Sequence, residues 1–297
     1  MENQNLENKE VETTKKSFWQ KIKKPFFFSL KFLPVVVIAI AFTCLYQFDL
    51  YPPEAMEEII SVFGNKNLVI AISILQNTGM IFFCCFFGYI LADKLGLLPC
   101  IKKDGKIKLF EKKKLLITLG ISLIVGILFS LDYWTFGKAI PQIREATDAG
   151  LSVWAFLASI LYGGICEELM LRLFVLSLFA FIIWKIFFAK KSKLSQIDNS
   201  EKTVAKIPPI VFVIANIIAS LLFAAGHLPA TLMTFGSITP LLLFRCFLYN
   251  GGIGYIFGWL YINYGLQYAM LSHVAVHVFS KIIWLLFVLK KILLEQL

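Results

Sequence analysis

Charged and imidazole side chains lie inside long apolar segments of this sequence. Glu167, Glu168 and Arg172 occur in the stretch Gly-Gly-Ile-Cys-Glu-Glu-Leu-Met-Leu-Arg. A charge at membrane depth costs roughly 2.5 kcal/mol or more, so such a residue needs a partner or a function. In a helix, Glu168 and Arg172 share one face because they are four residues apart, whereas Glu167 points about 100° away. We therefore interpret Glu168 as a carboxylate held by the arginine, and Glu167 as a carboxylate available for chemistry.

All three histidines of the chain also lie in apolar segments. His227 follows Phe223-Ala-Ala-Gly, and the four-residue spacing of His273 and His277 places them on one helix face. Three histidines and a free carboxylate are enough for acid–base work on a peptide bond, or for a metal site. Each residue alone could simply bridge helices through hydrogen bonds. Their number favours a functional site.

The elements that must position these residues are membrane-spanning helices. Hydrophobic residues make up 58% of the 297 residues and charged residues only 16%, with a mean hydropathy of +0.75. Soluble domains carry about 25% charged residues. Apolar segments long enough to cross a bilayer extend over residues 26–48, 68–98, 115–135, 151–188, 208–235, 240–263 and 266–289. Because isolated spans must satisfy their own backbone hydrogen bonds, the sequence predicts an all-α polytopic transmembrane helical bundle.

The number of spans depends on the fourth segment. At 1.5 Å per residue it would extend about 57 Å as an α-helix, which exceeds one membrane thickness. We expect it to be tilted, bent or divided, with Gly163 and Gly164 as the place for a bend. A division would give eight spans instead of seven, so the sequence predicts about 7–8.

Lysine clusters indicate the orientation of the chain in the membrane. They precede the first segment and follow the second and the fourth: Lys15, Lys16, Lys21, Lys23 and Lys24; Lys102, Lys103, Lys106, Lys108, Lys112, Lys113 and Lys114; and Lys190, Lys191, Lys193, Lys202 and Lys206. Because cytoplasmic loops are enriched in lysine and arginine, these clusters and the N-terminus are predicted to be cytoplasmic. The net charge of +10 lies in these short segments and not on a basic face with interleaved aromatics, which argues against nucleic-acid binding.

Two further features of composition bear on the environment. The six cysteines lie in or at the end of apolar segments without zinc or disulfide spacing, so we expect free, buried thiols. The lysine-, isoleucine- and phenylalanine-rich composition is typical of a bacterium with an AT-rich genome. The predicted location is therefore a bacterial plasma membrane, with the lipid bilayer as a partner.

The spacing of the unusual residues resembles a known family. Glu167-Glu168-x-x-x-Arg172, Phe223-x-x-x-His227 and His273-x-x-x-His277 resemble the EExxxR, FxxxH and HxxxN or HxxxB motifs of the CAAX protease and bacteriocin-processing (CPBP, or Abi) intramembrane proteases. The motifs occur in the family's order, on separate apolar segments. The resemblance implies a CPBP-type protease core at 151–290. Composition and charge predict a basic cytoplasmic N-terminal tail at 1–24, N-terminal transmembrane helices at 25–150 and a C-terminal tail at 291–297.

The resemblance also implies roles for individual residues. Glu167 would be the general base that activates water, and His227 would hold and orient that water. His273 and His277 would stabilise the oxyanion, while Glu168 and Arg172 match supporting positions. The family cleaves membrane-presented substrates, including prenylated C-terminal tails in eukaryotes and peptide precursors in bacteria. We therefore expect an intramembrane endopeptidase acting on a peptide or lipidated protein.

Position 277 departs from the commoner family pattern, which has asparagine there. A neutral histidine can still donate a hydrogen bond. However, Glu167, His227, His273 and His277 could also hold Zn²⁺ as a three-histidine and carboxylate set. We favour a mechanism that requires no cofactor, with zinc as an alternative.

Two other functions stay open at this point. One is a transporter-like proton or ion path, although no inverted repeat is visible. The other is a non-catalytic membrane scaffold or bacteriocin-immunity protein of the same fold. The sequence also poses a geometric difficulty. His227 lies near the far end of the fifth segment and His273 near the start of the seventh, so helices must tilt or break to bring them level.

Overall fold

The computed structural model describes residues 2–50, 53–97, 100, 110–148, 152–188 and 207–295. Within these ranges the chain forms helices and no strands. Seven helical stretches are long and apolar enough to cross a membrane: Ile22–Gln47, Lys66–Leu95, Lys112–Ala139, Val153–Phe188, Pro209–Phe235, Pro240–Tyr264 and Leu266–Phe287. The predicted all-α polytopic bundle is confirmed. The lysines at 102–108 and 190–206, and the predicted boundary at 150/151, lie outside the described residues.

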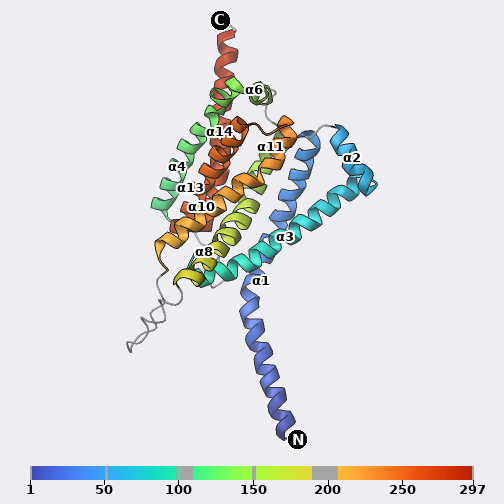
Figure 1. Cartoon of the computed structure of the whole chain (residues 1–297), viewed down its shortest axis with the longest axis vertical. Coiled ribbons are helices and arrows are strands. Elements are labelled where there is room, and N and C mark those ends of the chain that lie inside the picture. Colours follow the sequence, from blue (N-terminus) through green and yellow to red (C-terminus); the bar gives the residue numbers. More distant parts are fainter. Residues whose placement is uncertain are drawn as a thin grey trace.

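The helices follow one another as seven membrane-length stretches with short connecting helices (Figure 1). Their bounds are α1 (Glu2–Leu50), α2 (Pro53–Phe63), α3 (Lys66–Leu95), α4 (Lys112–Ser130), η1 (Leu131–Tyr133), α5 (Phe136–Ala139), α6 (Pro141–Asp148), α7 (Val153–Ala158), η2 (Ser159–Glu167), η3 (Leu169–Leu176), α8 (Ser177–Ile183), η4 (Trp184–Phe188), α10 (Pro209–Gly226), α11 (Leu228–Phe235), α12 (Pro240–Cys246), η5 (Phe247–Gly252), α13 (Ile253–Tyr264) and α14 (Leu266–Glu295).

The fourth span runs from Val153 to Phe188 as one continuous helical stretch, so the eighth span is not formed in the described part of the chain. Within it, η2, η3 and η4 are π-helical. Such segments are rare in proteins and frequently occur at functional sites. Gly163 and Gly164 do not divide the helix. A Cβ at Gly163 would lie 3.1 Å from the His273 Nε2 atom, and one at Gly164 would overlap the Val274 side chain. The two glycines therefore allow α14 to approach this span closely.

The N-terminal spans support the fourth span from one side. α1 packs against α3 and also contacts α7 and η2, and α3 packs against η3. A Cβ at Gly88 would lie 2.9 Å from the Leu173 backbone oxygen, so glycine permits this approach of α3 to η3. The buried core at this contact includes Ile81, Cys85 and Leu169. These helices fix the position of the span that carries the two glutamates.

α14 is held on its other side by α4. The two helices pack along their length, and the buried hydroxyls of Ser122 and Ser272 lie 2.8 Å apart in a hydrogen bond. A Cβ at Gly126 would lie 2.9 Å from the Phe279 Cβ atom. α14 is therefore held between α4 and η2, which fixes the height of its histidines relative to Glu167.

The fifth span is interrupted at His227. This residue ends α10 and precedes α11, with φ −89° and ψ −9°, and Pro229 lies in the first turn of α11. α10 runs obliquely across the bundle in Figure 1, while α14 rises almost along its long axis. The Asn216 Nδ2 atom donates a 2.9 Å hydrogen bond to the Tyr255 carbonyl, which joins α10 to α13. Asn216 is thus a helix-packing contact.

Arg245 is bound to an acidic partner. Its Nε atom donates to Asp132 Oδ1 at 2.9 Å and to Oδ2 at 3.2 Å, and its Nη2 atom also donates to Oδ2. Asp132 lies in η1, directly after α4, so the pair joins α12 to the end of the third span. All six cysteines are free and buried, as the sequence predicted.

Candidate active site

Glu168 and Arg172 form a buried ion pair. The Arg172 Nε atom lies 3.3 Å from Glu168 Oε2, and their side chains are 2% and 0% exposed. Glu168 Oε2 accepts no hydrogen bond, so this contact is ionic only. Arg172 Nη1 also has no hydrogen-bond partner. Arg172 Nη2 instead donates to the Gly254 carbonyl at 2.8 Å, and the guanidinium lies 4.7 Å from the Phe223 ring centroid. The pairing predicted from the four-residue spacing is confirmed.

Glu168 also holds His273. The Nδ1 atom of His273 lies 2.8 Å from Glu168 Oε1, across 105 residues of sequence. A carboxylate accepts, so Nδ1 carries the proton and the Nε2 atom of the neutral ring keeps its lone pair. This Nε2 atom lies 3.9 Å from Glu167 Oε2. Sequence reasoning missed the contact between Glu168 and His273, because nothing in the spacing indicates which helices meet.

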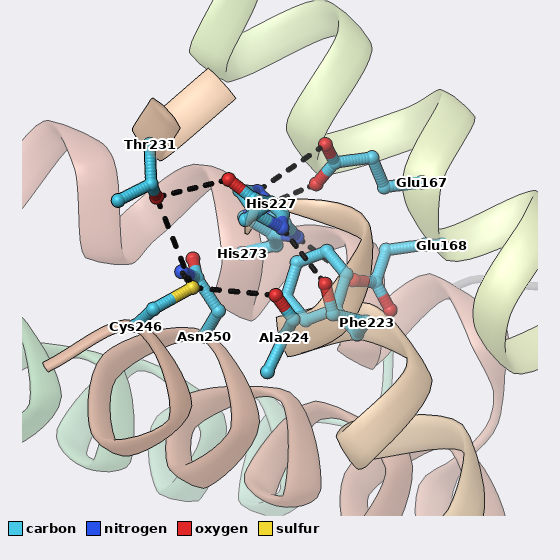
Figure 2. Close-up of polar contacts among 9 residues, drawn as sticks. All are labelled: Glu167, Glu168, Phe223, Ala224, His227, Thr231, Cys246, Asn250 and His273. Atoms are coloured by element: carbon cyan, nitrogen blue, oxygen red, sulfur yellow. Dashed lines mark hydrogen bonds and ion pairs between the residues drawn. The ribbon is translucent and has the colours of Figure 1, made fainter. Parts of the chain in front are cut away.

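His227 reaches the other oxygen of Glu167. Its Nδ1 atom lies 2.8 Å from the Phe223 carbonyl, which again assigns the proton to Nδ1. Its Nε2 atom lies 3.9 Å from Glu167 Oε1. The two imidazoles therefore turn their Nε2 atoms toward different oxygens of one carboxylate (Figure 2). This arrangement removes the geometric difficulty with His227 and His273, because α10 crosses the bundle obliquely.

His277 stacks on His273. The ring centroids are 5.3 Å apart with an interplanar angle of 24°, and the opposite face of His273 stacks on Phe257 at 4.5 Å. His277 also contacts the edge of Phe129. Among the described residues, the His277 ring has no hydrogen-bond partner, and it lines the same cavity as Glu167. Its tautomer is therefore not set by a protein group.

A cavity of about 670 Å³ brings the four candidate catalytic residues together. Its lining includes Glu167, His227, His273 and His277, and its wall continues along the fourth span through Ala155, Ser159 and Gly163. Glu168 and Arg172 lie behind this wall and do not line it. The volume is in the range of ligand-binding pockets. The two glutamates thus have the different positions that the sequence predicted.

Comparison with known families agrees with the motifs. Residues 149–279 match the family model described as type II CAAX prenyl endopeptidase Rce1-like. Residues 149–279 belong to the CAAX protease family. The matched segment contains all three motifs, from Glu167 to His277. No curated protein and no solved structure matches the chain. Membership of this family, with seven apolar helices, indicates a multi-pass membrane protein of a protease family.

The CAAX protease domain has further polar residues on the cavity wall that sequence reasoning missed. Asn250 Nδ2 donates to the Cys246 sulfur at 3.4 Å, and that thiol donates to the Ala224 carbonyl at 3.3 Å (Figure 2). Thr231 lies against the same sulfur at 4.0 Å. Asn250 could have been identified as a candidate from the sequence, since it is a polar residue within the sixth apolar segment. These contacts fix α12 and η5 against the end of α10.

The domain does not present the predicted zinc ligands as a ready-made set. Across the described ranges, no group of three or more histidine, cysteine, aspartate or glutamate side chains is arranged to hold a metal ion. Tetrahedral ligands about 2.0–2.1 Å from zinc would be about 3.4 Å apart, whereas Glu167 lies 3.9 Å from the Nε2 atoms of His227 and His273. Zinc therefore stays an alternative that rests on the donor types alone.

Proposed function

We propose that this chain is an intramembrane endopeptidase, in which Glu167 activates a water molecule to hydrolyse a peptide bond of a membrane-presented peptide or lipidated protein. The observation that supports this most directly is the position of the Glu167 carboxylate. It faces two histidine Nε2 atoms at 3.9 Å and lines a cavity large enough for a segment of peptide. Separations of 3.9 Å exceed a hydrogen bond but can be bridged by one water molecule.

The first chemical step follows from the proton positions. With Nδ1 of His227 donating to a carbonyl, its neutral ring accepts a hydrogen bond at Nε2. A water molecule between Glu167 and His227 would donate one hydrogen to each. Glu167 takes a proton from this water as its oxygen bonds to the substrate carbonyl carbon. His227 thereby orients the lone pair that attacks.

The second step requires stabilisation of the oxyanion and a proton for the leaving amine. His277 can present an N–H group to the cavity as a neutral ring, because no protein group fixes its tautomer. His273 lies beside His277. If the Nε2 atom of His273 also carried a proton, the Glu168 carboxylate at its Nδ1 atom would offset the positive charge of the ring. Glu167 then returns its proton to the amine nitrogen as the carbon–nitrogen bond breaks.

The same proposal includes the location of the enzyme. Lysine clusters before the first span and after the second and fourth support a cytoplasmic N-terminus. The composition supports a bacterial plasma membrane. Its partners would be the lipid bilayer and a peptide or lipidated protein substrate.

The test compares cells that carry the natural protein with cells that carry Glu167→Gln at equal expression. We expect one or a few uncleaved precursors to accumulate among the membrane and secreted peptides of the variant. Glu145→Gln is a matched control, because Glu145 is an exposed glutamate on α6. Cleavage that persists in the Glu167→Gln protein would overturn the proposal. Unchanged peptides together with an unchanged phenotype would favour the scaffold or immunity protein.

A further inference from the structure

The cavity reaches Glu167 from one end of the helix bundle. Its outer lining comes from the last turns of the first span at Thr43 and Gln47, the first turns of the fourth span at Ala155, and α11 at Thr231 and Thr234. In Figure 1, α11 lies toward the same end of the bundle as α2 and α6, away from the N-terminus. These segments therefore form the mouth of the cavity.

The bundle is closed on the other side of Glu167. The buried Glu168–Arg172 pair lies directly behind it. Further along the fourth span, the buried hydroxyls of Ser177 and Tyr261 lie 3.2 Å apart in a hydrogen bond. Leu173 and Leu176, in the turns between, are fully buried. Among the described residues, tightly packed side chains thus separate Glu167 from the far end of the bundle.

In the sequence, the lysine clusters adjoin the span ends that lie at that far end. They precede the start of the first span, follow the end of the second and follow the end of the fourth. The mouth side has fewer basic residues, namely Lys66, Lys138, Arg144, Arg245, Lys281, Lys290 and Lys291, and it carries acidic residues at Glu54, Glu57 and Glu58. The segment from His227 to Thr239 has no charged residue. By the lysine and arginine bias, the closed end faces the cytoplasm.

We infer that the catalytic cavity opens on the non-cytoplasmic side of the membrane and takes a peptide segment exposed on that side. A prenylated tail that stays in the cytoplasm does not reach Glu167 by this route. The substrate class is therefore an exported peptide or the outer segment of a membrane protein. Cleavage of such a substrate rests on the proposed function, whereas the direction of access does not.

The depth of the site adds a requirement on the substrate. Glu167 lies twelve residues after Ala155, so it lies at most about 18 Å inside the mouth. An extended chain advances about 3.3 Å per residue, so about five residues must enter before the scissile bond reaches Glu167. A chain end or a locally unfolded segment meets this requirement. The mouth offers Gln47, Thr234 and Tyr249 as polar groups for the entering backbone.

Cysteine labelling in intact cells tests the direction of access. The six native cysteines are buried, so their background reaction with maleimides is low. Thr234→Cys places a thiol at the mouth, Glu145→Cys marks the same side on α6, and Asn263→Cys places a thiol at the far end, where Asn263 is exposed. We expect a membrane-impermeant maleimide to label the first two variants in intact cells, and Asn263→Cys only after permeabilisation. The reverse pattern would overturn the inference.

A second measurement connects access with cleavage. A bulky maleimide attached to Thr234→Cys should slow the processing of the accumulated precursor at least tenfold, while the same group on Glu145→Cys should not. Equal processing in the two labelled proteins would show that the substrate does not use this mouth. If labelling follows the expected pattern but Glu167→Gln still cleaves, the access route stands and the proposed catalysis fails.

Discussion

Alanine substitution should lower the stability of the protein strongly at Glu168 but hardly at all at Glu167, the proposed general base. Glu168 is fully buried, lies 3.3 Å from the Arg172 guanidinium and accepts a 2.8 Å hydrogen bond from His273. Removing one partner of a buried ion pair costs about 3–5 kcal/mol, because the remaining charge is left uncompensated. The unpaired imidazole N–H adds about 1–3 kcal/mol, although such terms are not additive. We expect Glu168→Ala to lower the free energy of unfolding by at least about 3 kcal/mol.

Glu167→Ala should leave that free energy almost unchanged. The Glu167 side chain is 17% exposed and faces the cavity, and its histidine neighbours lie beyond hydrogen-bond distance. Even an exposed ion pair contributes only about 0–1 kcal/mol, and these histidines are neutral. Its removal should nevertheless lower the rate of cleavage by about 10²–10⁴, the range of a lost general base.

Reversible unfolding of the purified proteins in mixed detergent micelles measures the first quantity, and cleavage of the identified precursor measures the second. The double variant Glu168→Met/Arg172→Met is the control, because it removes both buried charges at similar volume. It should be more stable than Glu168→Ala. If both single variants lose equal stability, Glu167 is a structural residue and the division of roles between the two glutamates is wrong.

Two further predictions concern the histidines. His277→Asn should retain most of the cleavage rate, because asparagine still offers an N–H donor to the cavity, whereas His277→Leu should lose about 10²–10³-fold in rate, as for a lost oxyanion donor. Equal rates in these two variants would remove His277 from the mechanism. Treating the purified protein with a chelator should leave cleavage unchanged, since the 3.9 Å separations at Glu167 are longer than neighbouring zinc ligands require. Activity that is lost with the chelator and restored by Zn²⁺ would establish the metal alternative.

The membrane-spanning helices were predictable because they depend on local composition. Each predicted apolar segment agrees with an observed span to within a few residues, since hydropathy alone determines what can cross the bilayer. The pairing of Glu168 with Arg172 was also predictable, because both residues lie on one helix and their spacing places them on one face. These inferences needed no knowledge of how the helices pack.

The contacts between helices were not predictable in this way. The Asp132–Arg245 pair joins residues 113 positions apart on different helices, and no local pattern in the sequence indicates it. The role of Gly163 and Gly164 was also misjudged, because a glycine pair indicates either a bend or a close approach. Only the position of α14 against η2 shows that these glycines allow a close approach of two helices. Register between spans, which the sequence of a single chain does not encode locally, determines each of these features.

The adjacency of the two glutamates has a physical reason once the helix packing is known. Consecutive helical residues point about 100° apart, so one carboxylate can enter the protein interior while the next lines the cavity. Glu168 uses the interior position to bind both Arg172 on its own helix and His273 on α14. Its contact fixes the proton of His273 on Nδ1 and turns Nε2 toward Glu167. The arginine-bound glutamate therefore aligns the histidine that faces its neighbour. This explains why a second carboxylate remains buried at membrane depth although only one faces the cavity.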